Sequence, residues 1–400
     1  MREIREVQQE LDVNELNREL EEELETLPLT EEQEETEERP SGKTGRRHHG
    51  KKRNKRKRKK KGRAFRVIVI ILIILVLLLA GLVCAFFVLR SRGERQLAQS
   101  VVEETVAAPE EAELEDDGKY VVYKGERYCY NENIITILCM GVDKSMEDVS
   151  IENIGENGQA DAVFLAVLDK STGELSFVNI SRDSMVDINL YNTEGQFVGT
   201  ERMQLCLAYA YGDGRERSCE NTAEAVSRLM YGMPINAYAA IDYSGISVLN
   251  DAVGGVTVQV LEDLTEEDPE LEAGKTVTLT GEQAHTYVRE RDTSQLDSNN
   301  ARMARQKQYL TAFLSTAINE IRSNFGLVLT LYQTAAEYMV TDIDTSELTY
   351  LASLVVQKGF SEGNMYSVPG EVVRGEQYAE FIPDDEALYE LILDVFYEKV

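Results

Sequence analysis

The longest apolar run in the chain lies between residues 67 and 89, which read VIVIILIILVLLLAGLVCAFFVL without a charged or amide side chain. A helix rising about 1.5 Å per residue over this length spans the ~30 Å hydrocarbon core of a bilayer. A cleaved signal peptide has a shorter apolar run and a small-residue cleavage site nearer the N-terminus. The pattern therefore predicts one transmembrane helix over 67–89.

Beyond residue 120, short apolar stretches alternate with longer amphipathic ones. The short stretches predict strands at 134–140, 162–169, 175–180, 235–241 and 256–260. The longer ones predict helices at 221–231, 244–252, 281–287, 300–322, 328–338, 346–357 and 384–397. Strands and helices mixed in one stretch predict a layered α/β fold, with helices on both faces of a sheet.

The remaining segments differ in composition. Residues 1–66, acidic and then basic, predict a disordered tail. The alternative for residues 1–39 is a polar helix that folds back on the basic cluster. The polar, acidic residues 90–119 predict a stalk. The folded domain is expected over 120–400.

Charge is sorted along the chain, whose net charge is −29. Residues 1–66 carry 19 basic and 16 acidic side chains, and the other 23 basic and 55 acidic residues give the remainder −32. That excess argues against nucleic-acid binding by the whole protein, since such binding needs positive charge. Only three histidines are present, two of them in the basic tail, so Ser-His-Asp catalysis and multi-histidine metal sites are nearly excluded.

The basic cluster at 43–66 holds 15 Lys and Arg directly before the apolar run. This bias predicts a single-pass protein of the cell membrane, with a cytoplasmic N-terminus and residues 90–400 outside the cytoplasm. The same cluster is expected to bind anionic lipid headgroups. A nucleic-acid patch or a nuclear address is the alternative, less favoured by its position.

Two aspartates fall at neighbouring strand ends. Asp143 follows the first predicted strand and Asp161 opens the second. If these strands pair antiparallel, the end of one lies beside the start of the next, and both carboxylates lie exposed at one edge. Paired carboxylates suit Mg²⁺, which shares its other ligands with phosphates and water. The alternative, favoured by spacing alone, is that each aspartate caps a turn.

Several arginines have spacings that could gather them. Arg182 follows the third strand, and Arg289 and Arg291 would point to one side in an extended backbone. Arg302, Arg305 and Gln306 share a helix face. Any one arginine is explained by a salt bridge with a surplus carboxylate. Five together predict a phosphate site, because guanidinium groups bind phosphate bidentately.

The cysteines leave one question open. Cys139 lies in an apolar strand and is expected to be buried and free, whereas Cys206 and Cys219 could form a disulfide outside the cytoplasm.

Taken in order, several stretches resemble the LytR–CpsA–Psr family of bacterial cell-envelope proteins. They are ITILCMGVD, ADAVFLAVLD, LSFVNISRDSMVDI, LAYAYGDG, YGMPINAYAAIDYSGISVLNDAVGGVTVQV, LTGEQAHTYVRERD and NNARMARQKQYL, within residues 134–314. The resemblance implies an α/β domain that binds a polyprenyl (pyro)phosphate lipid in an apolar tunnel. It also implies a phosphotransferase that moves a glycopolymer with its linking phosphate from the lipid carrier onto peptidoglycan during cell wall assembly.

The resemblance also implies roles for single residues. Asp143 and Asp161 match the family's magnesium-associated aspartates, and Asp183 matches the aspartate of its Pro-Arg-Asp motif. The phosphate-facing positions are matched by Arg182, Arg289, Arg291, Arg302 and Arg305, and the glutamine of its Arg-Gln-Gln stretch by Gln306. Four positions depart from the pattern: Ser145 and Gln159 stand where arginine is frequent, Ser181 replaces proline, and Lys307 replaces a second glutamine.

The implied chemistry needs no histidine. Phosphoryl transfer depends mainly on positioning and on neutralising phosphate charge. Asp183 is a candidate base for the attacking sugar hydroxyl, with a salt bridge to Arg182 or a capping role as equal alternatives. The rival functions are a polyprenyl-pyrophosphate hydrolase with the same groups, and a non-enzymatic envelope regulator or transcriptional attenuator.

Overall fold

The structure is a computed structural model that describes residues 55–98, 105–150, 152, 154–291, 298–375 and 378–400. Contacts divide the chain into two units, Met1–Leu72 and Ile73–Val400. The predicted N-terminal tail falls largely outside the described residues, and all elements below except the first part of helix α2 belong to the second unit.

Helix α2 (Lys55–Leu97) contains the whole predicted apolar run. Its part from Ile74 to Leu97 has a mean hydropathy of 2.5 and is long enough to cross a membrane, with none of its most apolar window buried. Leu82, for example, is 69% exposed. A helix that leaves such side chains uncovered by protein is suited to a lipid environment.

The second unit is built on a six-stranded sheet in the order β12-β9-β4-β5-β6-β13. Strands β4, β5 and β6 form an antiparallel meander, which meets the condition set for the two aspartates, while β9 runs parallel to β4 and β13 parallel to β6. The strand bounds are β4 (Ile134–Val142), β5 (Ala160–Asp169), β6 (Glu174–Ile180), β9 (Ala237–Asp242), β12 (Met339–Thr341) and β13 (Phe360–Ser367).

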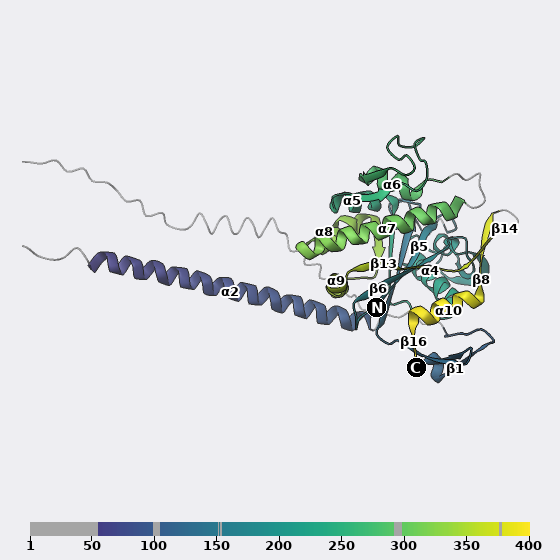
Figure 1. Ribbon diagram of the computed structural model, residues 1–400, viewed down its shortest axis with the longest axis horizontal. Helices are drawn as coiled ribbons and strands as arrows, with labels where there is room; N and C mark the ends of the chain where they lie inside the picture. The colour runs from purple at the N-terminus through teal and green to yellow at the C-terminus, as the bar shows by residue number, and fades with distance from the viewer. Residues whose placement is uncertain (1–54, 99–104, 151, 153, 292–297, 376–377) are drawn as a thin grey trace, which may run out of the picture. The chain divides into compact units, whose positions relative to one another are not determined.

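Helices cover both faces of this sheet, which confirms the predicted α/β fold (Figure 1). Alternate residues of β4 serve the two sides: Leu138 and Met140 join one core, and Ile135 joins the other. The first core packs on α3 (Cys206–Ala210), α4 (Glu216–Leu229) and α10 (Asp385–Phe396), and the second on α7 (Ser298–Ser323) and α9 (Thr345–Lys358). A third core joins α7 to α5 (Tyr243–Ala252), α6 (Gly281–Arg289) and α8 (Leu327–Ala335), which the short helix η3 (Ala336–Tyr338) follows.

Small sheets surround this framework, and of their strands the sequence predicted only the one at 256–260. They are β7 (Met185–Tyr191) with β8 (Phe197–Gln204), β10 (Val256–Gln259) with β11 (Thr276–Leu279), and β14 (Gly370–Arg374) with β15 (Ala379–Pro383).

The expected stalk at 90–119 is wrong at both ends, because residues 90–97 belong to helix α2, whose Leu97 is buried in the second core, and residues 112–115 belong to a small sheet. Strand β1 (Ala112–Glu115) pairs with β2 (Tyr120–Tyr123), which pairs with β3 (Glu126–Tyr130), and β16 (Tyr397–Lys399) completes the sheet; the short helix η1 (Asp116–Gly118) links β1 to β2. Leu114 packs on the first core although glutamates flank it. The acidic composition of this segment is typical of a linker, but its alternation of apolar and charged residues is typical of an edge strand.

All five cysteines are free thiols in this structure. Cys206 and Cys219 are both buried and are not joined, so the disulfide that the sequence left open is absent. Cys139 is free, as expected, although only partly buried.

Candidate active site

The two aspartates lie at the same edge of the sheet, where β4 ends and β5 begins. Gly141 pairs with Ala162 and Val142 with Ala160, so Asp161 is the extra residue of a β-bulge. Just beyond, the Gln159 N–H donates to the Asp143 carboxylate at 2.6 Å. Gly158 has φ +90°, and a Cβ there would lie 2.7 Å from the Lys144 Cβ, so this tight approach requires glycine. The antiparallel pairing therefore places both carboxylates at one edge of the sheet.

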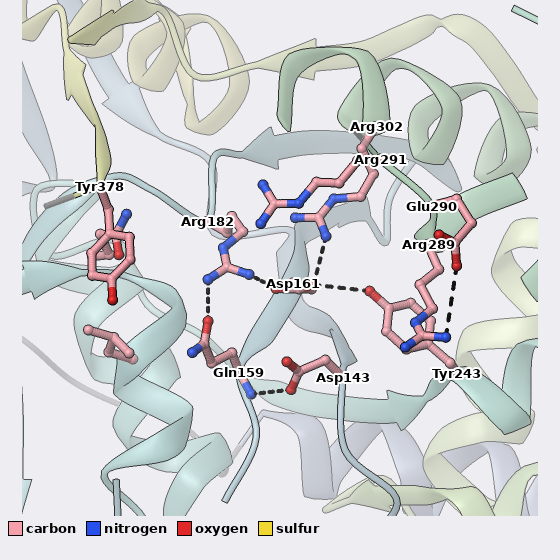
Figure 2. A pocket seen from close by; sticks show the side chains of 12 residues that line it. Asp143, Gln159, Asp161, Arg182, Tyr243, Arg289, Glu290, Arg291, Arg302 and Tyr378 are labelled. Carbon is pink, nitrogen blue, oxygen red and sulfur yellow. Dashed lines mark hydrogen bonds and ion pairs between the residues drawn. The ribbon is translucent and has the colours of Figure 1, made fainter. Parts of the chain in front are cut away.

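A polar cavity of about 580 Å³ opens at this edge (Figure 2). Its walls carry four arginines and three carboxylates, drawn from strand ends, helix ends and loops. The lining residues are Asp143, Gln159, Asp161, Arg182, Gln204, Leu207, Tyr243, Arg289, Glu290, Arg291, Arg302 and Tyr378. In a chain with so large an acidic excess, this concentration of guanidinium groups favours an anionic ligand.

Asp161 is the centre of a buried ion-pair network. It is only 7% exposed and forms ion pairs with Arg182 and with Arg302, the latter at 2.7 Å. The Tyr243 hydroxyl donates to it at 3.2 Å. The expectation that both aspartates are exposed is therefore wrong for Asp161, because the bulge turns its side chain among the arginines. It holds for Asp143.

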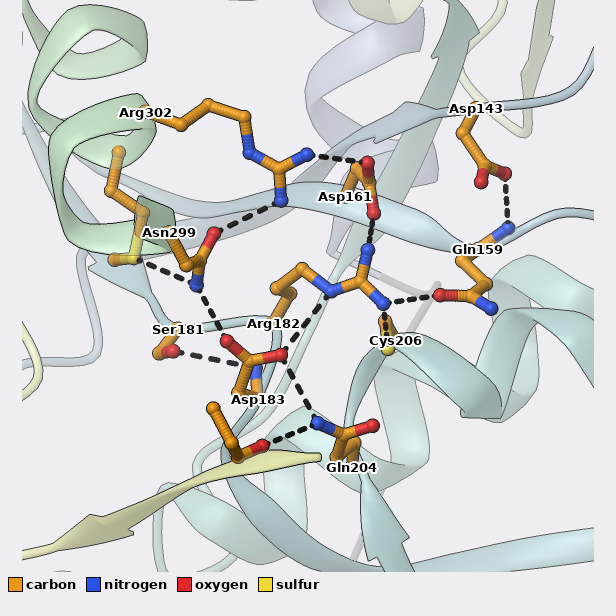
Figure 3. Close-up of polar contacts among 12 residues, drawn as sticks. Asp143, Gln159, Asp161, Ser181, Arg182, Asp183, Gln204, Cys206, Asn299 and Arg302 are labelled. Atoms are coloured by element: carbon orange, nitrogen blue, oxygen red, sulfur yellow. Dashed lines mark hydrogen bonds and ion pairs between the residues drawn. The ribbon is translucent and has the colours of Figure 1, made fainter. Parts of the chain in front are cut away.

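Arg182 is held on several sides (Figure 3). Besides Asp161, its guanidinium contacts the Gln159 side-chain oxygen and the Cys206 sulfur, the latter at 2.9 Å. Asp183 lies 3.4 Å from its Nε. A guanidinium fixed in this way is oriented before any ligand arrives, which favours tight binding of an anion.

Asp183 does not line the polar cavity. It accepts hydrogen bonds from Asn299 at 2.8 Å and Gln204 at 3.2 Å, and the Asn299 oxygen in turn accepts from Arg302 at 2.9 Å (Figure 3). Burial raises the pKa of Asp183, and the nearby arginines partly offset the effect. These contacts favour the salt-bridge alternative, in which Asp183 positions Arg182, over the role of base.

Arg289 and Arg291 are the less constrained cations of the cavity. Helix α6 ends at Arg289 and Glu290 is extended, so the two arginines are not both in extended backbone, yet both line the cavity. Arg289 is exposed and lies 3.9 Å from Glu290, while Arg291 forms no ion pair within the described residues. Burial lowers the pKa of Arg291, and so does the charge of Arg302 and Arg182. An arriving phosphate would relieve this repulsion.

Arg305 and Gln306 lie outside the polar cavity. Arg305 is fully buried, donates to the carbonyls of Tyr287 and Glu290, and pairs with Glu262 at 2.7 Å. It thereby fixes the end of α6 that presents Arg289. Gln306 donates to the Val288 carbonyl at 3.1 Å. The shared helix face was correctly predicted, but of the three residues on it only Arg302 reaches the cavity.

Next to the polar cavity is an apolar one of about 310 Å³, between the sheet and helices α5 and α7. The two share Tyr243. The apolar cavity is lined by Cys139, Met140, Gly141, Ala162, Phe164, Phe177, Ala239, Ile241, Tyr243, Ile246, Leu249, Val288, Gln306, Tyr309, Leu310, Phe313, Leu314 and Met339.

Tyr243 is the central residue that the sequence analysis missed. It follows β9, whose Asp242 pairs with Val142 in the parallel neighbour β4. Because the ends of parallel strands meet at one edge, knowledge of this pairing would have placed Tyr243 beside Asp143. The pairing itself is not visible in the sequence.

The donor set is compatible with a shared divalent cation. Asp143 and Asp161 both line the polar cavity, and the described residues contain no group of three or more His, Cys, Asp or Glu side chains that could hold a metal. A cation here would depend on phosphate oxygens and water for its other ligands, which is the arrangement Mg²⁺ favours. Asp161 already has arginine partners, so Asp143 is the more available ligand.

Curated relatives share this region at modest identity. The chain is 25% identical over 224 residues to the polyisoprenyl-teichoic acid–peptidoglycan teichoic acid transferase TagU of Enterococcus faecalis, covering 56% of this chain and 66% of that protein. It is 27% identical over 232 residues to TagV of Bacillus subtilis, a transferase of the same name, covering 56% and 54%. The matched regions thus span less than two thirds of either relative.

Solved structures with this fold include that of Bacillus subtilis TagV, with a TM-score of 0.50 at 23% identity over 66% of this chain and 97% of that one. Protein gbs0355 of Streptococcus agalactiae gives 0.52 at 21% identity, over 66% and 90%. The sequence profile of the LytR_cpsA_psr family matches residues 97–391, which include the residues that line both cavities. The chain belongs to the LytR_cpsA_psr family.

Proposed function

We propose that this protein is a membrane-anchored phosphotransferase that moves a glycopolymer, with its linking phosphate, from a polyprenyl-pyrophosphate carrier onto peptidoglycan. The observation that carries the proposal is the junction at Tyr243, where an arginine-rich cavity meets an apolar one. A lipid pyrophosphate has this division of character, with a charged head and a hydrocarbon tail. The transferase names of TagU and TagV support the same substrate class.

The distribution of charge in the polar cavity indicates which arginines would bind the pyrophosphate. Asp161 neutralises much of Arg182 and Arg302, so the network alone does not leave a large unbalanced charge. Arg289 and Arg291 then supply the cations that the pyrophosphate needs. The prenyl chain would occupy the apolar cavity, where burial of hydrocarbon contributes about 25 cal/mol per Å².

In the reaction, a hydroxyl of the peptidoglycan glycan attacks the phosphorus that carries the glycopolymer. A new P–O bond forms to the acceptor, the bridging P–O bond of the pyrophosphate breaks, and polyprenyl monophosphate leaves with the proton of the attacking hydroxyl. Arg182, held by Asp183 and Gln159, would stabilise charge on the phosphate oxygens as the bridge breaks. Mg²⁺, held by Asp143 with Asp161 beside it, would add Lewis-acid polarisation of the pyrophosphate.

The substrate need not be that of TagU or TagV. Two arginine positions of the family pattern are occupied here by Ser145 and Gln159, and Lys144 donates to the Glu156 carbonyl at 2.7 Å instead of lining the cavity. Gln159 accepts from Arg182. With fewer cations near the outer phosphate, we propose a glycopolymer that differs from theirs.

The deciding experiment separates transfer from hydrolysis. The fragment 91–400, which keeps the buried Leu97, is incubated with a lipid-linked glycopolymer labelled in its phosphate and with peptidoglycan oligomers. We expect label on the oligomers that depends on Arg182. Label released only as soluble glycopolymer phosphate would identify a polyprenyl-pyrophosphate hydrolase, and no turnover of either kind would favour an envelope regulator.

The metal is tested separately. Asp143→Ala should weaken Mg²⁺ binding in the presence of pyrophosphate while leaving the fold intact, because Asp143 is exposed. Calorimetry with Mg²⁺ and pyrophosphate measures this, and Glu156→Ala serves as a carboxylate control outside the cavity lining. Unchanged binding in Asp143→Ala would exclude this residue as a ligand.

Topology follows from the basic residues before the apolar run, and we propose that residues 90–400 lie outside the cytoplasm. Protease added to intact cells should digest them and spare the N-terminal tail. Protection of the C-terminal domain would contradict both the orientation and the peptidoglycan acceptor.

A further inference from the structure

Helix α2 does not end freely beyond its apolar run but packs against the N-terminus of α9. A Cβ added at Gly93 would lie 2.2 Å from the Ser346 carbonyl oxygen, so only glycine allows this approach. The Gln96 amide donates to Asp344, which caps α9, at 3.1 Å. Leu97 is 1% exposed and belongs to the second core. Close packing, a hydrogen bond and a buried side chain thus join the outer end of α2 to the domain.

This packing brings a residue of the apolar run itself against the domain. From Ile74 to Leu89 every side chain is exposed except that of Phe86, which is partly buried. The Phe86 ring meets the ring of Phe325 edge to face, with centroids 5.7 Å apart. Phe86 lies three residues before the run ends at Leu89, or about 4.5 Å along the helix. Phe325 is therefore at the depth where hydrocarbon gives way to headgroups.

The corner that carries Phe325 joins α7 to α8 and presents apolar side chains to the surroundings. Phe325 is 36% exposed, and Leu329, one helical turn later, is 45% exposed. On α2, Arg90, Arg92 and Arg95 follow within six residues of the end of the apolar run at Leu89. Aromatic and aliphatic side chains next to basic ones are typical of segments at a membrane interface.

We propose that the corner Phe325–Leu329 inserts into the outer leaflet of the bilayer beside α2. The partner is the lipid surface, and the domain is thereby attached to it at two points, the helix and the corner. The inference does not rest on the proposed phosphotransfer, since it concerns lipid contact alone. The α7 segment that lines the apolar cavity ends at Leu314, nine residues before Ser323, which is on the order of 14 Å from the corner along the helix.

The absence of tryptophan from the chain allows a direct test. The full-length protein is made with a single substitution, Phe325→Trp or Leu329→Trp, and reconstituted in phosphatidylcholine vesicles with and without bromine on the acyl chains. We expect emission at shorter wavelength than in water and loss of most of the fluorescence in the brominated lipid. The second position keeps the test valid if the first substitution disturbs the contact with Phe86.

Two matched Phe→Trp variants calibrate the result. Phe87→Trp lies within the span and should be strongly quenched, whereas Phe197→Trp on β8, where Phe197 is 59% exposed, should be unaffected by bromine. If Trp at 325 and 329 behaves as at 197, the corner does not enter the leaflet and the proposal fails. Short-wavelength emission without bromine quenching would instead indicate protein contact, such as a second copy of the chain, and would also overturn it.

Discussion

The polar and apolar cavities meet at Tyr243 but are built in different ways. The polar one is held by directional contacts between charged groups from distant segments, such as Asp161 with Arg182 and Arg302. The apolar one exists because small residues, among them Gly141, Ala162 and Ala239, leave space between the sheet and the helices. The first should therefore respond to the loss of single polar atoms, and the second to changes of volume. Four sets of substitutions test this difference.

The largest effect, a loss of folding stability, is expected for Arg302→Ala. Arg302 is 2% exposed, and its removal leaves Asp161 buried with one cation fewer and Asn299 without a partner for its oxygen. Breaking a buried ion pair costs roughly 3–5 kcal/mol, so urea unfolding of the 91–400 fragment should show a loss of that order. Arg289→Ala, at an exposed position, should cost at most about 1 kcal/mol. Equal losses would show that the network does not stabilise the fold.

Filling the apolar cavity should weaken binding of the lipid without changing binding of its pyrophosphate head. Ala239→Phe places a ring where the prenyl chain would lie, and we expect at least a tenfold loss of affinity for polyprenyl pyrophosphate, or about 1.4 kcal/mol. Affinity for inorganic pyrophosphate should not change. Ala304→Phe, at an exposed position outside both cavities, is the control. A parallel loss for both ligands would mean that the cavities do not divide the substrate as proposed.

Replacing an arginine of the polar cavity by lysine should cause an intermediate loss of affinity for pyrophosphate. Arg291→Lys and Arg289→Lys keep the charge but lose the bidentate geometry, which should cost roughly 1–3 kcal/mol of pyrophosphate binding for each contact broken. Arg202→Lys, whose Asp187 partner lies 4.0 Å away on the surface, should be nearly neutral. Identical affinities in all these variants, measured by calorimetry, would leave the cavity arginines as ordinary surface charge.

The smallest effect is expected on folding stability, for Tyr243→Phe at the junction of the two cavities. Tyr243→Phe removes the hydroxyl that donates to Asp161 but keeps the ring between the cavities, so stability should fall by about 1 kcal/mol. Lipid affinity should be retained, whereas Tyr243→Ala should reduce it. If Tyr243→Phe alone abolished lipid binding, the hydroxyl itself would be a ligand of the substrate.

The sequence by itself determined the framework. The run at 67–89 is apolar throughout, and helix α2 contains it. The continuous apolar runs predicted β4 and β5 as buried strands, and the short turn between β5 and β6 predicted the antiparallel order of that pair. The meeting of Asp143 and Asp161 was expected only if β4 and β5 pair antiparallel, which the structure shows. These features depend on local periodicity and on neighbours in the chain, and both can be read without knowing the fold.

Only the tertiary structure decided which polar atoms face the cavity. Arg302 and Arg305 have the same helical face and the same chemistry, yet one reaches Asp161 while the other is enclosed by α6 and Glu262. A β-bulge buries Asp161, and the parallel pairing of β9 with β4 brings Tyr243 into the cavity wall. The end of a long side chain reaches several ångströms from its backbone. Its partners are therefore set by the packing of segments far apart in sequence, which no local pattern encodes.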